Sequence, residues 1–213
     1  MDKQHPVVIG ISGASGAAIS RRLLYAVLQA GHDVHATMST AGQAVYAQEL
    51  GVTVDPQRFT LADLWPATPH TALDEPPATL DLPGQLSVYH QTNLMAPIAS
   101  GSFLTAGMVI CPCSGGTLAA IAAGTSTNLM QRAADVHLKE RRRLILVPRE
   151  TPLSLIHLEN LRSAHLAGAT ILPAAPGWYH GVQSVQDLVD FVVARILDQL
   201  GIENRLMQRW GTH

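Results

Sequence analysis

Short, continuous apolar runs alternate with helical patterns in the first fifty residues, and this alternation restricts the fold more than any other feature. Residues 6–12 (PVVIGIS) form the first run, residues 13–16 (GASG) form a turn, and residues 17–30 place apolar side chains at helical spacing. A strand buried on both faces has such a continuous run, and parallel strands need a helix between them. With residues 33–39 as a second strand and 41–50 as a second helix, the sequence predicts a β-α-β-α unit.

The same alternation returns after residue 86. Further strands are expected at residues 87–90, 108–112, 144–148 and 170–174, and further helices at 115–123, 128–142, 154–167 and 185–200. Strands that alternate with helices through short connections imply a parallel sheet covered on both faces. We therefore predict an α/β fold, a three-layer, Rossmann-like (flavodoxin-like) parallel sheet with helices on both faces. Residues 1–213 are expected to form a single domain, with a C-terminal helix and tail from about residue 185.

Residues 51–86 differ from the rest of the chain, because they contain six prolines and no strong periodicity. Such composition is typical of loops, and a long irregular segment inside a domain is uncommon. We predict a proline-rich surface excursion here, with a short helix near Leu61.

The composition argues against several classes of function. A formal net charge of −2 provides no basic field for nucleic acid or for an anionic membrane. No apolar run approaches the ~20 residues of a spanning helix, and the N-terminal residues do not resemble a signal peptide, so a cytoplasmic protein is expected. Only 14% of the residues are charged, against ~25% in typical domains. This favours an oligomer whose subunits cover part of the surface, with a compact, unusually neutral monomer as the alternative.

The two cysteines, Cys111 and Cys113, lie in one tripeptide. Two residues apart on one strand they cannot easily form a disulfide, and no second pair completes a zinc site. We expect Cys111 to be a small core residue and Cys113 a loop residue, and we predict no metal site.

Two turns rich in small residues come directly after predicted strands and directly before predicted helices. They are residues 10–16 (GISGASG) and 113–117 (CSGGT). Small residues there allow backbone N–H groups to approach a phosphate, which a helix N-terminus also attracts. The first turn lacks two glycines of the dinucleotide fingerprint, and the second strand provides no acidic residue for a ribose, which favours a mononucleotide or flavin over NAD. Tight packing, and helix capping by Ser114 and Thr117, are alternatives that need no ligand.

Charged side chains follow in the second half of the chain. Arg132 and Lys139 are seven residues apart, so they lie on one face of the predicted helix, two turns apart. Residues 141–143 (RRR) end this helix, where we expect them to be solvated and to suit the helix dipole. Arg149 and Glu150 end the next predicted strand, where a charged pair near the core needs a partner.

Tyr179 and, sixteen residues later, Arg195 add a phenol and a further guanidinium. Each of these polar residues fits a structural role when it is considered alone. Together they follow the carboxyl ends of strands, where ligands of parallel sheets bind, and this favours a common site.

Six blocks of the sequence resemble the signature blocks of the UbiX/Pad1 flavin prenyltransferases. They are residues 13–16 (GASG), 96–102 (APIASGS), 112–114 (PCS), 132–136 (RAADV), 138–142 (LKERR) and 148–153 (PRETPL). The resemblance runs in register from about Val7 to Gly201, apart from the proline-rich excursion. It implies a flavin-binding domain that joins a dimethylallyl group to N5 and C6 of reduced FMN.

The resemblance also implies roles for individual residues. Positions that hold FMN are matched by Gly13, Ala14, Ser15, Ser39, Ser114, Gly115, Gly116, Thr117 and Arg149. Positions that hold the substrate phosphate are matched by Arg132, Lys139, Tyr179 and Arg195. Glu150 matches a catalytic acid/base beside that phosphate, Ser15 a residue close to flavin N5, and Glu49 an acidic residue that a neighbouring subunit contributes. With Lys139, these three are the expected catalytic residues.

The implied substrate is dimethylallyl monophosphate or diphosphate. No acidic cluster resembles a magnesium-diphosphate site, which favours a metal-free reaction on the monophosphate. Arginine and lysine side chains fixed around the leaving phosphate would lower the barrier, because charge builds there as the bond breaks. The implied partners are further copies of the chain, twelve in the family, and a UbiD-like decarboxylase that receives the prenylated FMN.

Three positions depart from the family pattern. Thr127 stands where the family usually has Asp, Gly181 where a basic residue is frequent, and Leu94 where an aromatic residue is expected near the prenyl group. Two other functions therefore stay open. An FMN-dependent cysteine decarboxylase is disfavoured, because neither its PASANT-like block nor an obvious equivalent of its histidine is found. A catalytically silent flavin-binding protein would not need the full set of charged residues.

Overall fold

The apolar runs of the sequence form a six-stranded sheet in the computed structural model, which describes residues 5–67, 73 and 75–211. The strands are β1 (Val7–Ile11), β2 (Val34–Met38), β3 (Leu86–His90), β4 (Gly107–Cys113), β5 (Leu144–Pro148) and β6 (Thr170–Ile171). All neighbours pair in parallel, in the order β3-β2-β1-β4-β5-β6. Every residue of β1, β4 and β5 is buried, because both faces of the sheet are covered.

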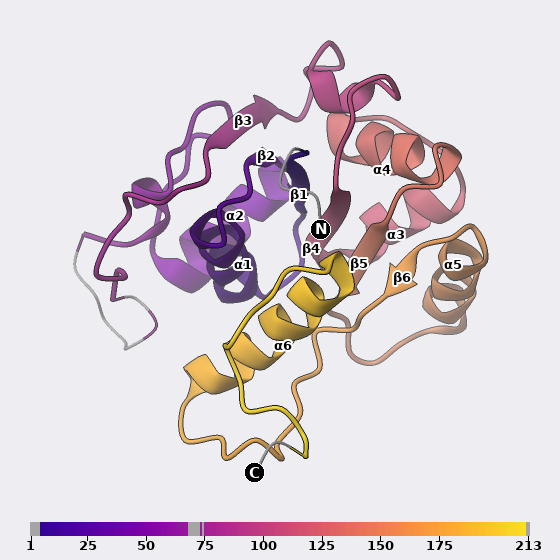
Figure 1. Cartoon of the computed structure of the whole chain (residues 1–213). Coiled ribbons are helices and arrows are strands. Elements are labelled where there is room, and N and C mark those ends of the chain that lie inside the picture. Colours follow the sequence, from indigo (N-terminus) through magenta and orange to yellow (C-terminus); the bar gives the residue numbers. More distant parts are fainter. Residues whose placement is uncertain (1–4, 68–72, 74, 212–213) are drawn as a thin grey trace.

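Helices cover both faces of this sheet (Figure 1). They are α1 (Ala17–Gln29), α2 (Thr40–Leu50), α3 (Gly115–Ala122), α4 (Leu129–Lys139), α5 (Leu155–Leu166) and α6 (Val185–Leu200), with the short 3-10 helices η1 (Ala62–Leu64) and η3 (Pro97–Ala99). One core cluster joins α1, α2 and α6 to Val7 and Ile9 of β1, and a second joins α3, α4 and α5 to Val8. Successive side chains of a strand point to opposite faces, so the two groups of helices form the two outer layers. The predicted three-layer α/β fold is confirmed.

The path of the chain across the sheet reverses between β1 and β4. The strands β1, β2 and β3 extend toward one edge of the sheet, and β4, β5 and β6 extend from β1 toward the other edge. Ligands of open parallel sheets bind at the carboxyl ends of the strands, at such a switch point. The turns after β1 and β4 are therefore neighbours where a ligand is expected.

Helix α4 is shorter than the sequence predicts. Asn128 caps its start, because the side chain accepts the N–H of Gln131 at 2.9 Å. The helix ends at Lys139 and not at residue 142, since Arg141 has a left-handed φ of 53°. A non-glycine residue in this conformation carries no clear signal in the sequence.

We expected the arginines that follow α4 to be solvated, but two of them, Arg142 and Arg143, also donate hydrogen bonds to carbonyl oxygens. Arg142 donates hydrogen bonds to the carbonyl oxygens of Gly101 and Phe103, and Arg143 donates to that of Leu200 at 2.5 Å. These contacts attach the start of β5 to the loop after η3 and to the end of α6. The prediction of solvated side chains was wrong for Arg142, whose partners come from a distant part of the chain, while Arg141 and Arg143 are exposed, as expected.

Two strand boundaries also differ from the prediction. Cys113, expected in a loop, is the buried last residue of β4, and burial raises the pKa of its thiol to about 12. The last strand ends at Ile171 and not at residue 174. The segment still follows β5, since the N–H of Ala174 donates to the carbonyl oxygen of Pro148 at 3.0 Å.

The proline-rich segment 51–86 is anchored to the core and is a surface excursion only in part. Its buried apolar residues are Val52, Val54, Phe59, Leu61 and Leu64. The predicted short helix is η1. Arg21 of α1 donates to the carbonyl oxygen of Leu64 at 3.2 Å and lies 5.1 Å from the ring centroid of Trp65. Prolines interrupt regular structure here but leave apolar side chains able to pack against the core. The sequence interpretation predicted a surface excursion and did not predict this packing.

Candidate active site

Two hydrogen bonds through Ser12 hold the turn after β1 against the turn after β4. The Ser12 hydroxyl donates to the carbonyl oxygen of Pro112 at 2.7 Å and accepts the N–H of Ser114 at 2.8 Å. Ser12 is buried, so both bonds are shielded from water and favour one arrangement. On the other side of β1, the N–H of Ser39 donates to the carbonyl oxygen of Ile11 at 2.9 Å. Three strand ends that carry predicted FMN residues are thus held side by side.

Glycine is required where the turn after β1 meets α2. A Cβ on Gly13 would lie 2.3 Å from the Cβ of Ala41, and a Cβ on Gly42 would lie 2.8 Å from the carbonyl oxygen of Ile11. Real Cβ atoms do not approach so closely, so both positions exclude a side chain. Tight packing therefore explains these glycines, as the alternative without a ligand proposed. Such packing does not prevent the same turn from binding a ligand.

A carboxylate occupies the N-terminus of α1. The Glu49 side chain, near the end of α2, accepts the N–H of Gly16 at 3.0 Å and the N–H of Ala17 at 2.9 Å. Carboxylates and phosphates both favour such a helix end, so Glu49 competes with a phosphate for these N–H groups. In the single chain Glu49 lies against its own subunit, and its predicted approach to a neighbouring flavin stays a prediction.

The N-terminus of α3 is open, in contrast to that of α1. The Ser114 hydroxyl accepts the N–H of Thr117 at 3.4 Å, so the capping predicted from the sequence is present. Within the described part of the chain, the N–H groups of Gly115 and Gly116 have no acceptor. A Cβ on Gly116 would meet nothing within 4 Å. Two available N–H groups at the positive end of a helix suit a phosphate or a polar flavin atom.

Arg149 and Glu150 follow β5 and lie close to this open helix end. Oε2 of Glu150 is 3.8 Å from the position that a Cβ on Gly115 would occupy, and Nε2 of His157 is 3.0 Å from it. The Arg149 and Glu150 side chains are exposed, so no buried charge there needs a partner. Nδ1 of His157 accepts the N–H of Ser154 at 3.2 Å, which leaves Nε2 directed at α3. A carboxylate and an imidazole therefore lie at the start of α3, and the exposed Arg149 directly precedes this carboxylate in the sequence.

The predicted FMN residues lie at the carboxyl ends of four adjacent strands. In sheet order these ends carry Ser39 (β2), Gly13, Ala14 and Ser15 (β1), Ser114, Gly115, Gly116 and Thr117 (β4), and Arg149 (β5). Small side chains, two available N–H groups and one exposed guanidinium fit a planar ring system that carries a phosphate.

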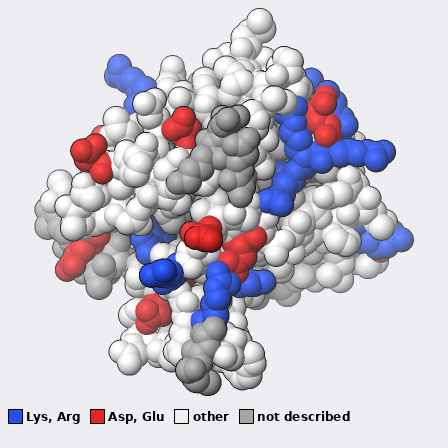
Figure 2. Space-filling view, in the orientation of Figure 1, with Lys and Arg blue, Asp and Glu red and all other residues white. Residues whose placement is uncertain are grey.

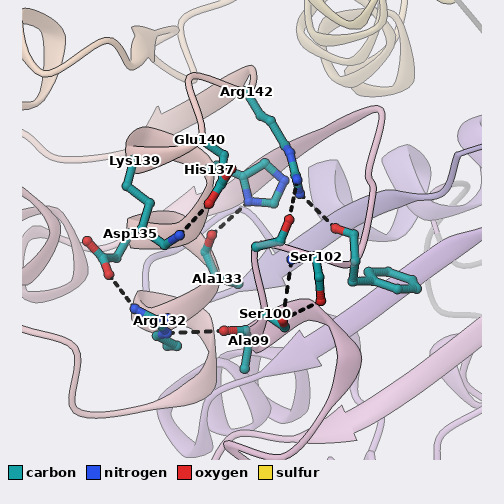
Figure 3. A network of polar contacts seen from close by, with 12 residues as sticks. Ala99, Ser100, Ser102, Arg132, Ala133, Asp135, His137, Lys139, Glu140 and Arg142 are labelled. Carbon is teal, nitrogen blue, oxygen red and sulfur yellow. Dashed lines mark hydrogen bonds and ion pairs between the residues drawn. The ribbon is translucent and has the colours of Figure 1, made fainter.

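Arg132 and Lys139 lie on one face of α4, as predicted, beside the loop that contains η3 (Figure 3). Nε of Arg132 donates to the carbonyl oxygen of Ala99 at 3.1 Å, and its Nη1 lies 2.7 Å from Oδ2 of Asp135. Nζ of Lys139 pairs with Glu140. Each cation therefore has a carboxylate from a nearby position in the sequence, and both cationic side chains stay partly exposed.

A buried histidine of α4, His137, fixes the same loop to this helix through Thr105. Nδ1 of His137 lies 2.7 Å from the carbonyl oxygen of Ala133, and Nε2 lies 2.8 Å from the Thr105 hydroxyl. Nδ1 therefore carries the proton, and Nε2 accepts one from Thr105. Burial lowers the pKa of His137 to about 4, so the side chain is neutral at pH 7.

Tyr179 and Arg195 belong to a separate group of residues around α6. The ring of Tyr179 lies 5.8 Å from that of Phe191 in an edge contact, and Arg195 follows Phe191 by one helical turn. Nη1 of Arg195 lies 2.7 Å from Oδ2 of Asp198. Phe191 and Arg195 line a pocket of about 290 Å³ with the residues that follow β6.

The four predicted phosphate residues do not meet within one chain. Helix α4, with Arg132 and Lys139, packs in one core cluster, and α6, with Arg195, packs in the other, on the opposite face of the sheet. No hydrogen bond or ion pair of the described residues joins the two groups. Figure 2 shows the largest groups of Lys and Arg on this face over α4 and over the α6 region, each beside Asp or Glu. We call Arg132, Asp135, Lys139 and Glu140 the α4 unit, and Tyr179, Arg195 and Asp198 the α6 unit.

The three departures from the family pattern have different structural settings. Leu94 is half exposed, beside the almost fully exposed Met95. Thr127 donates through its N–H and its hydroxyl to Oε1 of Gln131, at 2.9 and 2.8 Å. Gly181 has a left-handed φ of 76°, a conformation that favours glycine over a basic residue.

Several residues near the site were missed in the sequence interpretation. They are Ser12, His157, Asp198, Arg209 and Trp210. A capping signal existed for His157, which lies three residues after Ser154. Nothing local indicated Asp198 or Arg209, whose ion pair spans eleven residues.

Metal and membrane features are not found in the part of the chain that is described. No group of His, Cys, Asp or Glu side chains there could hold a metal ion, and no helix there is long and apolar enough to cross a bilayer.

Comparison with known proteins places this geometry in a family. Residues 1–197 match the Flavoprotein family. The flavin prenyltransferase UbiX of Pseudomonas aeruginosa is 49% identical over 205 residues, which cover 96% of this chain and 93% of that protein.

Two solved structures share the fold over nearly the full chain. The crystal structure of AnUbiX (PadA1) in complex with FMN and dimethylallyl pyrophosphate has a TM-score of 0.80 and 34% identity, and covers 98% of both chains. A dodecameric FMN-dependent UbiX-like decarboxylase from Escherichia coli O157:H7 has a TM-score of 0.75 and 36% identity, with 96% of this chain and 98% of that chain covered. Near-complete coverage at these identities shows that the chain belongs to the flavoprotein family and, within it, to the UbiX-type flavin prenyltransferases.

Proposed function

We propose that the chain is a flavin prenyltransferase, which transfers a dimethylallyl group from dimethylallyl phosphate to N5 and C6 of reduced FMN. The observation that carries this proposal is the set of strand ends at the switch point, where an open helix N-terminus lies beside Glu150 and β5 ends next to Arg149. The relatives named flavin prenyltransferase and the solved structure with FMN and dimethylallyl pyrophosphate support the same activity.

FMN is proposed to bind across the ends of β2, β1, β4 and β5. The available N–H groups of Gly115 and Gly116 would contact its polar or phosphate oxygens, and Arg149 would add a positive charge. Gly13 and Ala14 leave room for the ring, and the exposed Ser15 is the proposed neighbour of N5. Reduced FMN supplies the nucleophilic N5 when it is bound.

Loss of the phosphate is the step in which the cationic residues act. As the bond between carbon and the phosphate oxygen breaks, negative charge builds on the phosphate, and Arg132, Lys139 and Arg195 are proposed to stabilise it. Glu150 is proposed to give a proton to the departing phosphate. A charge-assisted hydrogen bond contributes roughly 1.5 to 3 kcal/mol, so each cation is worth about tenfold or more in rate.

Ring closure at C6 needs a base, because the C6 proton must leave when the prenyl chain bonds there. The prenyl double bond is consumed in the same step and must gain a proton, which the released phosphate, protonated in the first step, would supply. Glu150, deprotonated in that step, or the phosphate after it has given up this proton, would accept the C6 proton. Glu49 is proposed to take part from a neighbouring subunit. For that role it would have to leave the N–H groups of Gly16 and Ala17.

An oligomer is proposed to complete the site. The α4 and α6 units lie on opposite faces of the sheet within one chain, so one phosphate could meet both only if a second copy supplied one of them. Exposed apolar side chains suited to such contacts are Leu94, Met95, Leu155, Ile156, Leu158 and Leu166. The dodecameric relative supports a closed assembly of many copies.

The recipient of the product is proposed to be a UbiD-like decarboxylase, in line with the resemblance of the sequence. The cysteine decarboxylase alternative is disfavoured by the high identity to flavin prenyltransferases. A silent flavin-binding protein is the remaining alternative, and it makes the opposite prediction in the test that follows.

Mass spectrometry of the flavin tests the proposed function. The oligomer is incubated without oxygen with reduced FMN and dimethylallyl monophosphate, and in parallel with the diphosphate. We expect the FMN mass to increase by one C5H8 unit, with an equal amount of inorganic phosphate released from the monophosphate or of pyrophosphate released from the diphosphate. Bound but unmodified FMN with both substrates would show that the chain is a silent flavin-binding protein.

A further inference from the structure

Two arginines share the carboxylate of Asp198 on α6. Its Oδ2 lies 2.7 Å from Nη1 of Arg195, while Arg209 contacts Oδ1 at 2.7 Å and Oδ2 at 3.1 Å. Asn204 adds a hydrogen bond to Oδ1 at 3.1 Å. The Asp198 side chain is only 17% exposed, so these contacts are better shielded than those of an ordinary surface ion pair. Burial alone would raise the pKa of Asp198, but the bonds from Arg209 and Asn204 outweigh it and lower the pKa.

The residue after Arg209 returns to the proposed phosphate site. The ring of Trp210 lies 5.2 Å from that of Tyr179, edge to face. Tyr179 in turn contacts Phe191, one helical turn before Arg195. Arg209 and Asn204 therefore attach the C-terminal segment to α6, and Trp210 brings the same segment back to Tyr179.

The charge of this arrangement depends on Arg209. Arg195 and Arg209 carry two positive charges against the one negative charge of Asp198, so the three side chains keep a net positive charge. Without Arg209, Arg195 and Asp198 would form a neutral pair. A phosphate would then have to separate Arg195 from a carboxylate with no other cation to hold it.

We propose that Arg209 is a positioning residue for the substrate phosphate. By holding Asp198, it leaves Arg195 available to the phosphate, and it keeps Trp210 against Tyr179. This inference rests on the proposed function, in which Tyr179 and Arg195 bind the phosphate of dimethylallyl phosphate. Arg209 itself acts only through these neighbours.

The first test is Arg209→Ala, with Arg205→Ala as its matched control. Arg205 lies on the same segment and carries the same charge, and among the described residues it makes no ion pair with Asp198. We expect Arg209→Ala to raise KM for dimethylallyl monophosphate about tenfold, with kcat and FMN affinity nearly unchanged. Arg205→Ala should keep the original KM. An unchanged KM in Arg209→Ala would overturn the proposal.

A double variant separates the charge effect from a merely structural role. In Arg209→Ala/Asp198→Asn, residue 198 carries an uncharged amide, which does not compete with the substrate phosphate for Arg195 as the carboxylate does. KM should therefore return to within about threefold of the original value. A structural role predicts a further increase, because a second tie to α6 is lost, and that result would contradict the proposal.

Arg195→Ala distinguishes failure of this inference from failure of the proposed site. A raised KM in Arg195→Ala combined with an unchanged KM in Arg209→Ala would overturn the role of Arg209 alone. An unchanged KM in both variants would remove the α6 unit from the proposed site and the inference with it.

Discussion

The α4 unit and the α6 unit are both proposed to hold one phosphate, but they are built differently. On α4, Arg132 pairs with Asp135 and Lys139 pairs with Glu140, so each cation has its own carboxylate. On α6, Arg195 shares its carboxylate with a second arginine from the C-terminal segment. The α4 unit is therefore close to neutral, and the α6 unit together with Arg209 is net positive.

The two units also differ in what keeps them in place. The α4 unit is tied to the loop around η3 by Arg132 and by the buried His137, which contacts Thr105. The α6 unit depends on a segment that follows α6 by several residues. We therefore expect the α4 unit to be ordered before substrate binds, and the α6 unit with Arg209 to add the positive charge that attracts a phosphate.

The largest effect is expected at Glu150, which belongs to neither unit. Glu150→Gln keeps the size of the side chain but removes its ionisable proton, so kcat should fall by about 10²- to 10⁴-fold with little change in substrate binding. Stopped-flow or mass-spectrometric prenyl transfer measures this directly.

Glu159→Gln is the control for Glu150→Gln, because Glu159 is an exposed carboxylate on α5 that pairs only loosely with Arg162, at 3.9 Å. It should keep full activity. Normal transfer by Glu150→Gln would remove this residue from the mechanism and leave the released phosphate as the base at C6.

A smaller effect is expected when the pH is lowered. Acid should first destabilise α4, the helix that carries the α4 unit. The folded-state pKa of His137 is about 4, below the ordinary 6.5. Between these values the unfolded chain binds the extra proton, so stability is present above pH 6.5 and is lost as pH falls toward 4. The free energy of unfolding should be about 2 kcal/mol lower at pH 5 than at pH 7 from this group.

Urea unfolding at both pH values, repeated with His137→Gln, measures that contribution. The variant removes the titrating group and should reduce the pH dependence by about 2 kcal/mol. The same pH dependence in the variant would show that His137 does not cause it. His35, whose pKa burial also lowers, would then be the next candidate.

The smallest of these effects is expected for Lys139→Ala. Loss of one phosphate contact should raise KM for dimethylallyl monophosphate about tenfold, with FMN affinity and melting temperature nearly unchanged. Glu140 is partly exposed and loses little when its partner is removed. Equal loss of FMN and activity would assign Lys139 a structural role, and Arg162→Ala on α5 provides a charge-matched control.

The sequence predicted those features that depend on local pattern. Buried parallel strands are continuous apolar runs, and Ser114 and Asn128 cap their helices through neighbouring residues, so both could be recognised. It could not predict that Arg141 ends α4, since nothing local marks a left-handed arginine. Nor could it place Glu49 at the start of α1, because that contact spans 32 residues.

The candidate site, like the fold, was predictable only where local sequence pattern defines it. The strand-end turns were recognised from their glycines and serines, while the separation of the α4 and α6 units depends on which face of the sheet each helix covers. Arg209 was missed because a lone arginine near the C-terminus has no periodic or motif signal. Long-range ion pairs are tertiary features, and local sequence rules do not contain them.

Complementation between subunits tests the central claim, that one site combines an α4 unit and an α6 unit from different copies. One chain carries Arg132→Ala and Lys139→Ala, the other carries Tyr179→Phe and Arg195→Ala, and the two are co-expressed with different tags. If two copies complete each site, random mixing leaves roughly a quarter of the sites with both units intact. We therefore predict that purified mixed oligomers regain about a quarter of the original prenyl transfer, while each variant alone is nearly inactive. Mixed oligomers that assemble normally and are no more active than either variant alone would contradict the account.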